Sequence, residues 1–364
     1  MKYYLIAGER SGDLHGGNLI KALKNYDADG QFRGYGGDNM EAQGMHLSVH
    51  YRELAFMGFL EVVKNLGTIT AYLKKCKADI AEFRPDVVVL IDYAGFNLKI
   101  ARFCKSNGIR VFYYISPKVW AWNTKRAWKL KRLVDRMFVI MPFEKDFYKK
   151  FNWEVDYVGN PVLDALKSYK ISRVDFDKKK TVALLPGSRR QELENALPVF
   201  CELCDRFPEY HFVVAAVDNI DRNVYAALEE KPNAGLVFGN TYDLLAGARA
   251  AVVTSGTATL ETALWRVPQV VTYRTSGVSY RIAKALIKVD YISLVNLIAG
   301  KMVVRELIQK DFNVEMLAEE LGSLIQNEEY REQMLKAYTE IYDLLDRGSA
   351  SDNAARLMVN YLTL

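Results

Sequence analysis

Two series of short apolar segments, each followed by a helical pattern, limit the folds open to this chain more than any other feature. They lie at residues 3–7, 31–35, 87–91, 109–115 and 136–141 in the first half, and at residues 181–185, 211–217, 236–238, 250–254 and 269–273 in the second. Nearly continuous apolar runs separated by helices are typical of parallel strands buried on both faces of a sheet. The sequence therefore predicts an α/β protein with doubly wound sheets.

The 364 residues suffice for two domains, each with its own core. A charged stretch at residues 172–180 separates the two series and is predicted to be the linker. We expect two Rossmann-like domains, residues 1–171 and 172–326, that face each other across a cleft and bind ligands at the carboxyl ends of their strands. Residues 327–364 form a helical tail that either crosses back to the first domain or exchanges with a partner subunit, which leaves a homodimer open.

The composition is that of a soluble globular protein, with 50% hydrophobic and 26% charged residues. A net charge of +5 suits an anionic ligand or an anionic lipid surface and is too mild to predict binding to nucleic acid. The N-terminal residues lead directly into a strand and lack the pattern of a signal peptide, which predicts a cytoplasmic protein. The four cysteines fit reduced thiols of that compartment.

A candidate phosphate-binding loop follows the apolar run at residues 181–185. Gly187 lets the backbone approach a ligand, and Ser188 and Arg189 supply a hydroxyl and a bidentate donor for phosphate oxygens. The amides at the start of the next helix favour an anion there. An ordinary Pro-Gly turn with a solvated arginine explains this segment equally well by itself.

A second loop of the same kind follows the run at residues 250–254. Ser255, Gly256 and Thr257 offer hydroxyl side chains and free amides to a second phosphate. Glu261 lies one helical turn further on and has a carboxylate that can accept hydrogen bonds from vicinal ribose hydroxyls. Together the two loops predict a nucleotide diphosphate site in the second domain.

In the first half, Asp92 ends an apolar strand, where a carboxylate is costly to bury unless it is used. We expect it at the mouth of the cleft as the general base that takes a proton from an attacking hydroxyl. Capping of the next helix or pairing with a basic neighbour are the alternatives. Ser11 and Gly12, after the first strand, are candidates for holding a polar or anionic group, although a turn in which Asp13 caps its own helix explains that loop equally well.

Motifs in order along the chain resemble those of the lipid-A-disaccharide synthase family, whose members are two-domain GT-B glycosyltransferases. They are AGERSGDLHG (7–16), MGFLEV (57–62), IDYAGFN (91–97), YISPKVWAW (114–122), MPFE (141–144), YVGNP (157–161), LLPGSRRQEL (184–193), SGTATLE (255–261), VVTYR (270–274) and YISLVNLIAG (291–300). Each motif is weak alone, but their order over most of the chain is specific.

The resemblance implies transfer of 2,3-diacylglucosamine from its UDP conjugate to 2,3-diacylglucosamine 1-phosphate. The product would be a β-1,6-linked disaccharide, formed with inversion and without a metal or other cofactor. Matched to this sequence, the family pattern makes Asp92 the base, Ser11 the serine of the first loop, Arg189 the diphosphate ligand and Asn296 a further substrate contact. Without a metal, Arg189 and helix amides must neutralise the departing diphosphate.

Several positions depart from the family pattern and bear on acceptor and acyl-chain specificity. They are Arg10, Gly95, Lys118, Asn123, Asn160 and Val295. Gly95 stands where a second aspartate usually follows, which leaves Asp92 as the base candidate at this strand end.

The segment at residues 54–73 carries a wide apolar stripe flanked by lysines. Its candidate membrane or acyl-chain contacts are Phe56, Met57, Phe59, Leu60 and Val63. We predict that it dips into the anionic inner face of the cytoplasmic membrane, so that the protein is peripherally bound there. Packing within the first domain or in a dimer contact is the alternative. A second basic and aromatic stretch, residues 120–132, could bind the acceptor phosphate or lipid head groups.

Two other functions remain open on sequence grounds. A sugar-nucleotide epimerase of the same architecture would also bind UDP in its second half, but it would need acid and base groups on both faces of the sugar. In a non-catalytic nucleotide or lipid-binding protein, Asp92 would be structural.

Overall fold

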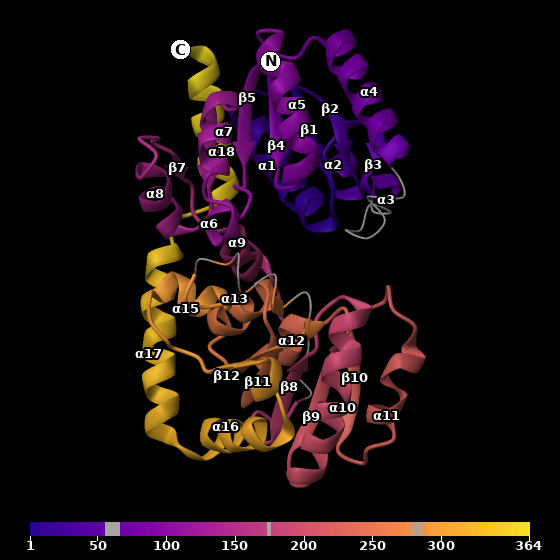
Figure 1. Cartoon of the computed structure of the whole chain (residues 1–364), viewed down its shortest axis with the longest axis vertical. Coiled ribbons are helices and arrows are strands. Elements are labelled where there is room, and N and C mark those ends of the chain that lie inside the picture. The colour runs from indigo at the N-terminus through magenta and orange to yellow at the C-terminus, as the bar shows by residue number, and fades with distance from the viewer. Residues whose placement is uncertain (55–65, 173–175, 278–279, 282–283, 285–286, 288) are drawn as a thin grey trace. The chain divides into compact units, whose positions relative to one another are not determined.

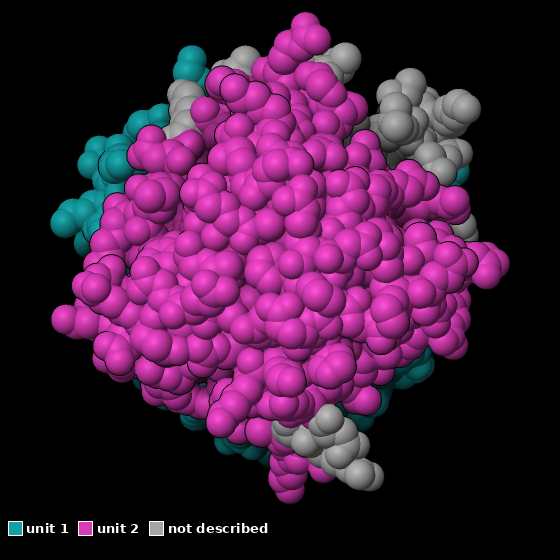
Figure 2. All heavy atoms as spheres, turned by 90° about the horizontal axis from the view of Figure 1, so that it is seen from below, with its two compact units in different colours: residues 1–161, 347–364 teal, residues 162–346 magenta. Residues whose placement is uncertain are grey.

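The computed structural model describes residues 1–54, 66–172, 176–277, 280–281, 284, 287 and 289–364. The chain forms two compact units, which Figure 2 shows in teal and magenta. The first contains Met1–Pro161 and Arg347–Leu364, and the second contains Val162–Asp346. The second unit therefore begins before the predicted boundary at residue 172, and the predicted tail is divided between the two units.

Within the described residues, the first unit holds a seven-stranded sheet in the order β3-β2-β1-β4-β5-β6-β7 (Figure 1). Its neighbouring strands all pair in parallel. The strands are β1 (Lys2–Ala7), β2 (Gln31–Gly36), β3 (His46–His50), β4 (Val87–Ile91), β5 (Arg110–Tyr114), β6 (Arg136–Val139) and β7 (Asp156–Tyr157). The helices are α1 (Arg10–Tyr26), α2 (Asp38–Ala42), α3 (Tyr51–Leu54), α4 (Leu66–Phe83), α5 (Ala94–Ser106), α6 (Val119–Trp122), α7 (Arg126–Leu133), α8 (Pro142–Lys149) and α18 (Ala350–Thr363).

The central strand β4 shows why its sequence is an unbroken apolar run. All of its side chains are completely buried, and successive residues contribute to different cores. Val88 and Leu90 join the core that contains α4 and α5, whereas Val87, Val89 and Ile91 join the core that contains α1 and α18. Both faces of the sheet are thus covered by helices, which confirms the predicted doubly wound arrangement.

The described part of the second unit holds a six-stranded parallel sheet in the order β10-β9-β8-β11-β12-β13. Its strands are β8 (Thr181–Leu185), β9 (His211–Ala216), β10 (Ala234–Phe238), β11 (Ala250–Thr254), β12 (Gln269–Tyr273) and β13 (Glu306–Ile308). Its helices are α9 (Pro161–Ser168), α10 (Arg190–Arg206), η1 (Arg222–Tyr225), α11 (Ala226–Glu229), α12 (Thr241–Ala246), α13 (Thr257–Leu264), α15 (Leu294–Ala299), η2 (Gln309–Asp311), α16 (Val314–Gln326) and α17 (Glu328–Leu345). α9 starts at the last residue of the first unit.

The C-terminal helix α18 packs on the first unit beside α1. Ala354, Ala355 and Met358 are completely buried in the same core as the α1 side chains. At its edges, Tyr26 donates a hydrogen bond to Asp352 (2.8 Å), and the hydroxyl of Tyr361 lies 3.1 Å from Asp156 of β7. Residues from the two ends of the chain therefore share one core.

No helix among the described residues is both long and apolar enough to cross a lipid bilayer.

Candidate active site

The predicted phosphate loop after β8 already holds an anion, the carboxylate of Glu192. Glu192 Oε2 accepts hydrogen bonds from the amides of Ser188 (2.9 Å) and Arg189 (3.1 Å) at the start of α10. Gly187 has a φ of +102°, and a Cβ there would lie 2.2 Å from that oxygen, so glycine is required on both grounds. The expectation that these two amides bind the diphosphate is corrected, because the protein's own carboxylate takes them.

The side chain of Arg189, by contrast, is available to a ligand. It is 82% exposed and touches Glu192 at 3.3 Å. An exposed ion pair of this kind is worth roughly 0–1 kcal/mol, so the guanidinium can leave it at small cost. Arg189 therefore remains a candidate for binding the diphosphate through its side chain.

The loop after β11 presents a helix start with no side-chain cap. β11 pairs with β8 in parallel, so both loops lie at the carboxyl ends of the strands and at adjacent positions. Gly256 precedes α13 and caps it without a side chain, and both Gly256 and Thr257 are exposed. The first amides of a helix have no acceptor within the helix and carry a partial positive charge. At the carboxyl ends of these strands, the start of α13 is therefore a better place for an anion than the start of α10.

Glu261, the predicted ribose ligand, is held by a tyrosine that sequence analysis did not single out. The hydroxyl of Tyr242, on α12, donates a hydrogen bond to Glu261 Oε1 at 2.8 Å. Burial raises the pKa of the Glu261 carboxyl, and the Tyr242 hydrogen bond opposes that rise. The Tyr242 ring packs against Tyr169 and Trp265, with ring centres 5.0 and 5.6 Å away. These contacts fix the carboxylate on the first turns of α13.

Ser255 and Asn296 belong to a single hydrogen-bond network that shapes the segment before α15. Ser255 Oγ donates to the carbonyl of Ile292 (2.9 Å), and Glu306 accepts from the amides of Ile292 and Ser293. Asn296 donates from Nδ2 to Glu306 (2.9 Å) and to the carbonyl of residue 304 (2.8 Å). Its Oδ1 accepts from the amides of residues 303 and 304.

Asn296 thus uses both of its donors and both lone pairs within the protein, and its side chain is completely buried. This differs from the predicted substrate contact, since a ligand could bind its side chain only by breaking one of these bonds. We assign Asn296 to positioning the chain around Ser293. Glu306, which sequence analysis missed, serves the same network from β13.

In the first unit, three non-glycine residues at the carboxyl ends of β4 and β5 have left-handed backbone conformations. The φ angles are 44° at Asp92, 45° at Tyr93 and 64° at Ile115. Such a conformation is a genuine outlier for a β-branched residue such as isoleucine, and each costs on the order of 1–3 kcal/mol. β4 and β5 are neighbours, so the strained residues lie close together at the carboxyl ends of these two strands. Strain of this kind is typical of functional sites.

Asp92 is exposed as a residue, yet the protein around its carboxyl removes part of that group's hydration. This partial burial raises its pKa, and the negative charge of Glu9 raises it further. Lys118, one of the residues that depart from the family pattern, lowers the pKa by its positive charge. A carboxylate with a raised pKa is a better proton acceptor than an ordinary aspartate.

The loop after β1 lies against this strained turn. A Cβ on Gly8 would lie 2.4 Å from the ring of Tyr93, so only glycine fits there. Ser11 and Gly12 lie in the first turn of α1, where Ser11 is exposed. The alternative role for Asp13, a cap on its own helix, is wrong, because Asp13 accepts hydrogen bonds from the amides of residues 37, 39 and 40 at the start of α2.

The predicted membrane contacts Phe56, Met57, Phe59, Leu60 and Val63 lie outside the described residues. The second basic and aromatic stretch is described and exposes two tryptophans, Trp122 (44% exposed) and Trp128 (49%). Arg126 lies over the Trp122 ring at 5.1 Å and Lys131 over the Trp128 ring at 5.7 Å.

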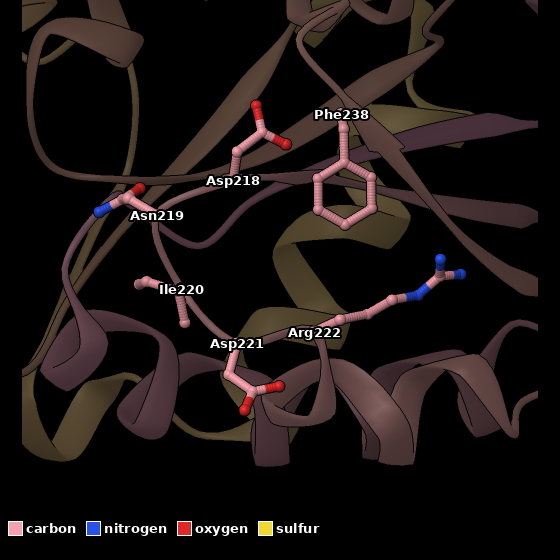
Figure 3. Close-up of a pocket in the computed structure, with 6 residues that line it drawn as sticks. All are labelled: Asp218, Asn219, Ile220, Asp221, Arg222 and Phe238. Atoms are coloured by element: carbon pink, nitrogen blue, oxygen red, sulfur yellow. The ribbon is translucent and has the colours of Figure 1, made fainter.

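A pocket of about 490 Å³ lies at the carboxyl ends of β9 and β10 (Figure 3). Two carboxylates, Asp218 and Asp221, stand on its rim, and Asp221 also caps η1 by accepting from the amide of Asn223 (2.9 Å). The one cation in the lining, Arg222, is paired with Glu229 at 2.6 Å. An acidic rim disfavours phosphate, so this pocket adds no diphosphate contact.

Comparison with known proteins supports the family resemblance that the sequence motifs indicated. The profile of the lipid-A-disaccharide synthetase family matches residues 3–359. The chain belongs to the lipid-A-disaccharide synthase family. It is 40% identical to the lipid-A-disaccharide synthase of Syntrophus aciditrophicus over 96% of this chain and 95% of that protein. It is 38% identical to the synthase of Myxococcus xanthus, over 98% of this chain and 97% of that protein.

Solved structures of other proteins share the fold of this lipid-A-disaccharide synthase family member at low identity. A UDP-GlcNAc 2-epimerase from Neisseria meningitidis, bound to UDP-GlcNAc, has a TM-score of 0.67 at 16% identity, with all of both chains covered. The glycosyltransferase of kitacinnamycin has a TM-score of 0.69 at 14% identity, with 99% of both chains covered. The fold is thus that of the GT-B glycosyltransferases, and family membership makes the chain a glycosyltransferase of lipid A biosynthesis.

Proposed function

We propose that this enzyme is an inverting glycosyltransferase that moves 2,3-diacylglucosamine from UDP to 2,3-diacylglucosamine 1-phosphate. The products are the β-1,6-linked lipid A disaccharide 1-phosphate and UDP. Family membership supports the reaction class, and the strained turn that carries Asp92 is the observation that supports a base at this position. The uncapped start of α13 and the exposed Arg189 side chain follow the neighbouring strands β11 and β8, and they support a diphosphate site in the second unit.

In the proposed reaction, Asp92 takes the proton from the 6-hydroxyl of the acceptor as its oxygen attacks the anomeric carbon of the donor. The new C–O bond forms on the face opposite the leaving group, and the bond to the diphosphate oxygen breaks with its electron pair. Attack from the opposite face inverts the configuration. Arg189 and the first amides of α13 bind the negative charge that UDP carries away, and Glu261 holds the ribose. We propose that no metal takes part, so activity should survive a chelator.

Replacing Asp92 by asparagine tests the proposal. Asp92→Asn keeps the shape of the side chain but cannot accept the proton, so kcat should fall by on the order of 100-fold or more while the Kd of UDP stays the same. The measurement is UDP release with both lipid substrates, and with the donor alone. A turnover close to that of the parent enzyme would refute the base assignment. Release of UDP that requires the acceptor separates a transferase from an epimerase.

We also propose that the enzyme docks on an anionic membrane to collect its acylated substrates. Residues 118–134 contain six lysines and arginines and no acidic residue, and Trp122 and Trp128 are exposed among them. Exposed tryptophans surrounded by basic side chains suit the interface of an anionic bilayer. The apolar residues predicted at positions 56–63 would enter the same bilayer.

Sedimentation with lipid vesicles tests this docking. Trp128→Ser and Phe59→Glu should each reduce the fraction bound to vesicles that contain anionic phospholipid, because each removes an apolar contact with the interface. Met302→Ser is the matched control, since Met302 is 71% exposed and belongs to the second unit and to neither segment. Equal binding of all three variants and the parent enzyme would contradict the proposal.

A further inference from the structure

The strained turn after β4 is held by two buried side chains, Asn97 and Tyr113, to which the sequence analysis assigns no role. The main-chain carbonyl oxygen of Asp92 accepts hydrogen bonds from Asn97 Nδ2 (2.8 Å) and from the hydroxyl of Tyr113. Asn97 Nδ2 also donates to the carbonyl of Ile91 at 3.3 Å. Both side chains are completely buried. One backbone oxygen thus accepts hydrogen bonds from two elements, α5 and β5.

The alternative path of the chain shows what these bonds prevent. Side chains alternate between the two faces of a strand, so if β4 continued regularly, Asp92 would share the face of Val88 and Leu90. That face is packed in the apolar core formed with α4 and α5. The left-handed conformation of Asp92 and Tyr93 turns the chain out of the strand, so that the Asp92 side chain does not enter this core. A conformation that side chains rarely adopt persists only where its surroundings hold it.

We propose that Asn97 and Tyr113 are positioning residues, which fix the Asp92 main chain so that its carboxylate points at the attacking hydroxyl. This inference rests on the proposed role of Asp92 as the base. Neither residue touches substrate in this proposal. Their hydrogen bonds stop the peptide between Asp92 and Tyr93 from rotating, and the direction of the Asp92 Cα–Cβ bond follows from that peptide.

Tyr113→Phe is the main test, because it removes one hydroxyl and keeps the ring. We expect kcat to fall by about 10- to 100-fold, as misplacement of a catalytic group typically does, with the KM values and the Kd of UDP within about twofold of the parent. Asn97→Ala should give the same division between kcat and KM.

Tyr4→Phe is the matched control. The buried Tyr4 hydroxyl, in the same core, donates to Asp79 at 2.6 Å, so its removal costs stability without touching the turn. Tyr4→Phe should lower Tm at least as much as Tyr113→Phe does and leave kcat unchanged. If kcat follows Tm in both variants, the role of Tyr113 is only structural and the inference is wrong.

A second readout uses the Asp92→Asn enzyme as the background. If Tyr113 acts through the Asp92 carboxylate, adding Tyr113→Phe should leave the residual rate of that enzyme unchanged. A further fall of tenfold or more would overturn the inference. The two proposals fail differently: an active Asp92→Asn enzyme refutes the base itself, whereas an inactive Asp92→Asn beside a fully active Tyr113→Phe refutes only the positioning role.

Discussion

Charged side chains around Asp92 set the pH at which it can accept a proton. Asp92 must be ionised to act as a base, so kcat/KM should rise with pH through its pKa. Partial burial and Glu9 raise that pKa, and Lys118 lowers it. The acidic limb of the kcat/KM profile should therefore lie at a higher pH than the pKa of an ordinary aspartate. Lys118→Met should move the limb to higher pH, and Glu9→Gln should move it to lower pH.

The measurement is kcat/KM between about pH 3 and 9, which spans the ordinary aspartate value of about 3.9 and a raised one. Lys2→Met is the matched control. Lys2 begins β1 and so lies at the amino ends of the parallel strands, whereas Asp92 follows the carboxyl end of β4. This variant should leave the limb in place. Shifts of Lys118→Met and Glu9→Gln in the same direction would mean that the limb belongs to another group.

Among the elements, the buried strands could be predicted from sequence and three edge or short strands could not. Sequence patterns indicated β4, β8, β11 and β12 with their observed bounds, because strands covered on both faces are continuous apolar runs. β3, β7 and β13 have mixed sequences, HLSVH, DY and ELI. A strand that pairs on one side only, or for only two or three residues, needs no apolar run, and so carries little signal.

At the candidate site, the positions of the loops could be predicted but the partners within them could not. The segments that contain Asp92, Arg189 and Glu261 were predictable, since each follows a strand. The hydrogen bonds from the phosphate-loop amides to Glu192, and from Tyr242 to Glu261, were not. Those contacts depend on rotamers and on elements brought together by the fold. The motif LLPGSRRQEL includes Glu192 without indicating its role, and none of the quoted motifs includes Tyr242.

At the scale of the whole molecule, the first unit is built from the two ends of the chain and the second unit is inserted between them. A single sequence cannot show where an amphipathic terminal helix docks, and the pattern of residues 327–364 fitted either the first domain or a partner subunit. The structure resolves that pattern into α17, whose buried Met334 and Tyr338 belong to the second unit, and α18, which belongs to the first. The first unit therefore cannot complete its core until α18 has been synthesised.

A chain that ends at Asp346 tests this dependence. It lacks α18, so the apolar surface of α1 that covers Ala354, Ala355 and Met358 would face water, and loss of several buried side chains typically costs several kcal/mol. Hydrogen exchange should show loss of protection in β1 and α1, whereas β8 and β11 stay protected. The Kd of UDP, which we assign to the second unit, should remain close to that of the parent enzyme.

The matched control is a chain shortened by Leu364 alone, which is 95% exposed and should change neither protection nor stability. Full protection of β1 in the chain that ends at Asp346 would mean that α18 adds no stability to the first unit. Loss of protection in β8 and β11 as well would mean that the two units unfold as one. Because the second sheet has its own core and all of its strands within residues 181–308, we expect it to stay folded when the first unit opens.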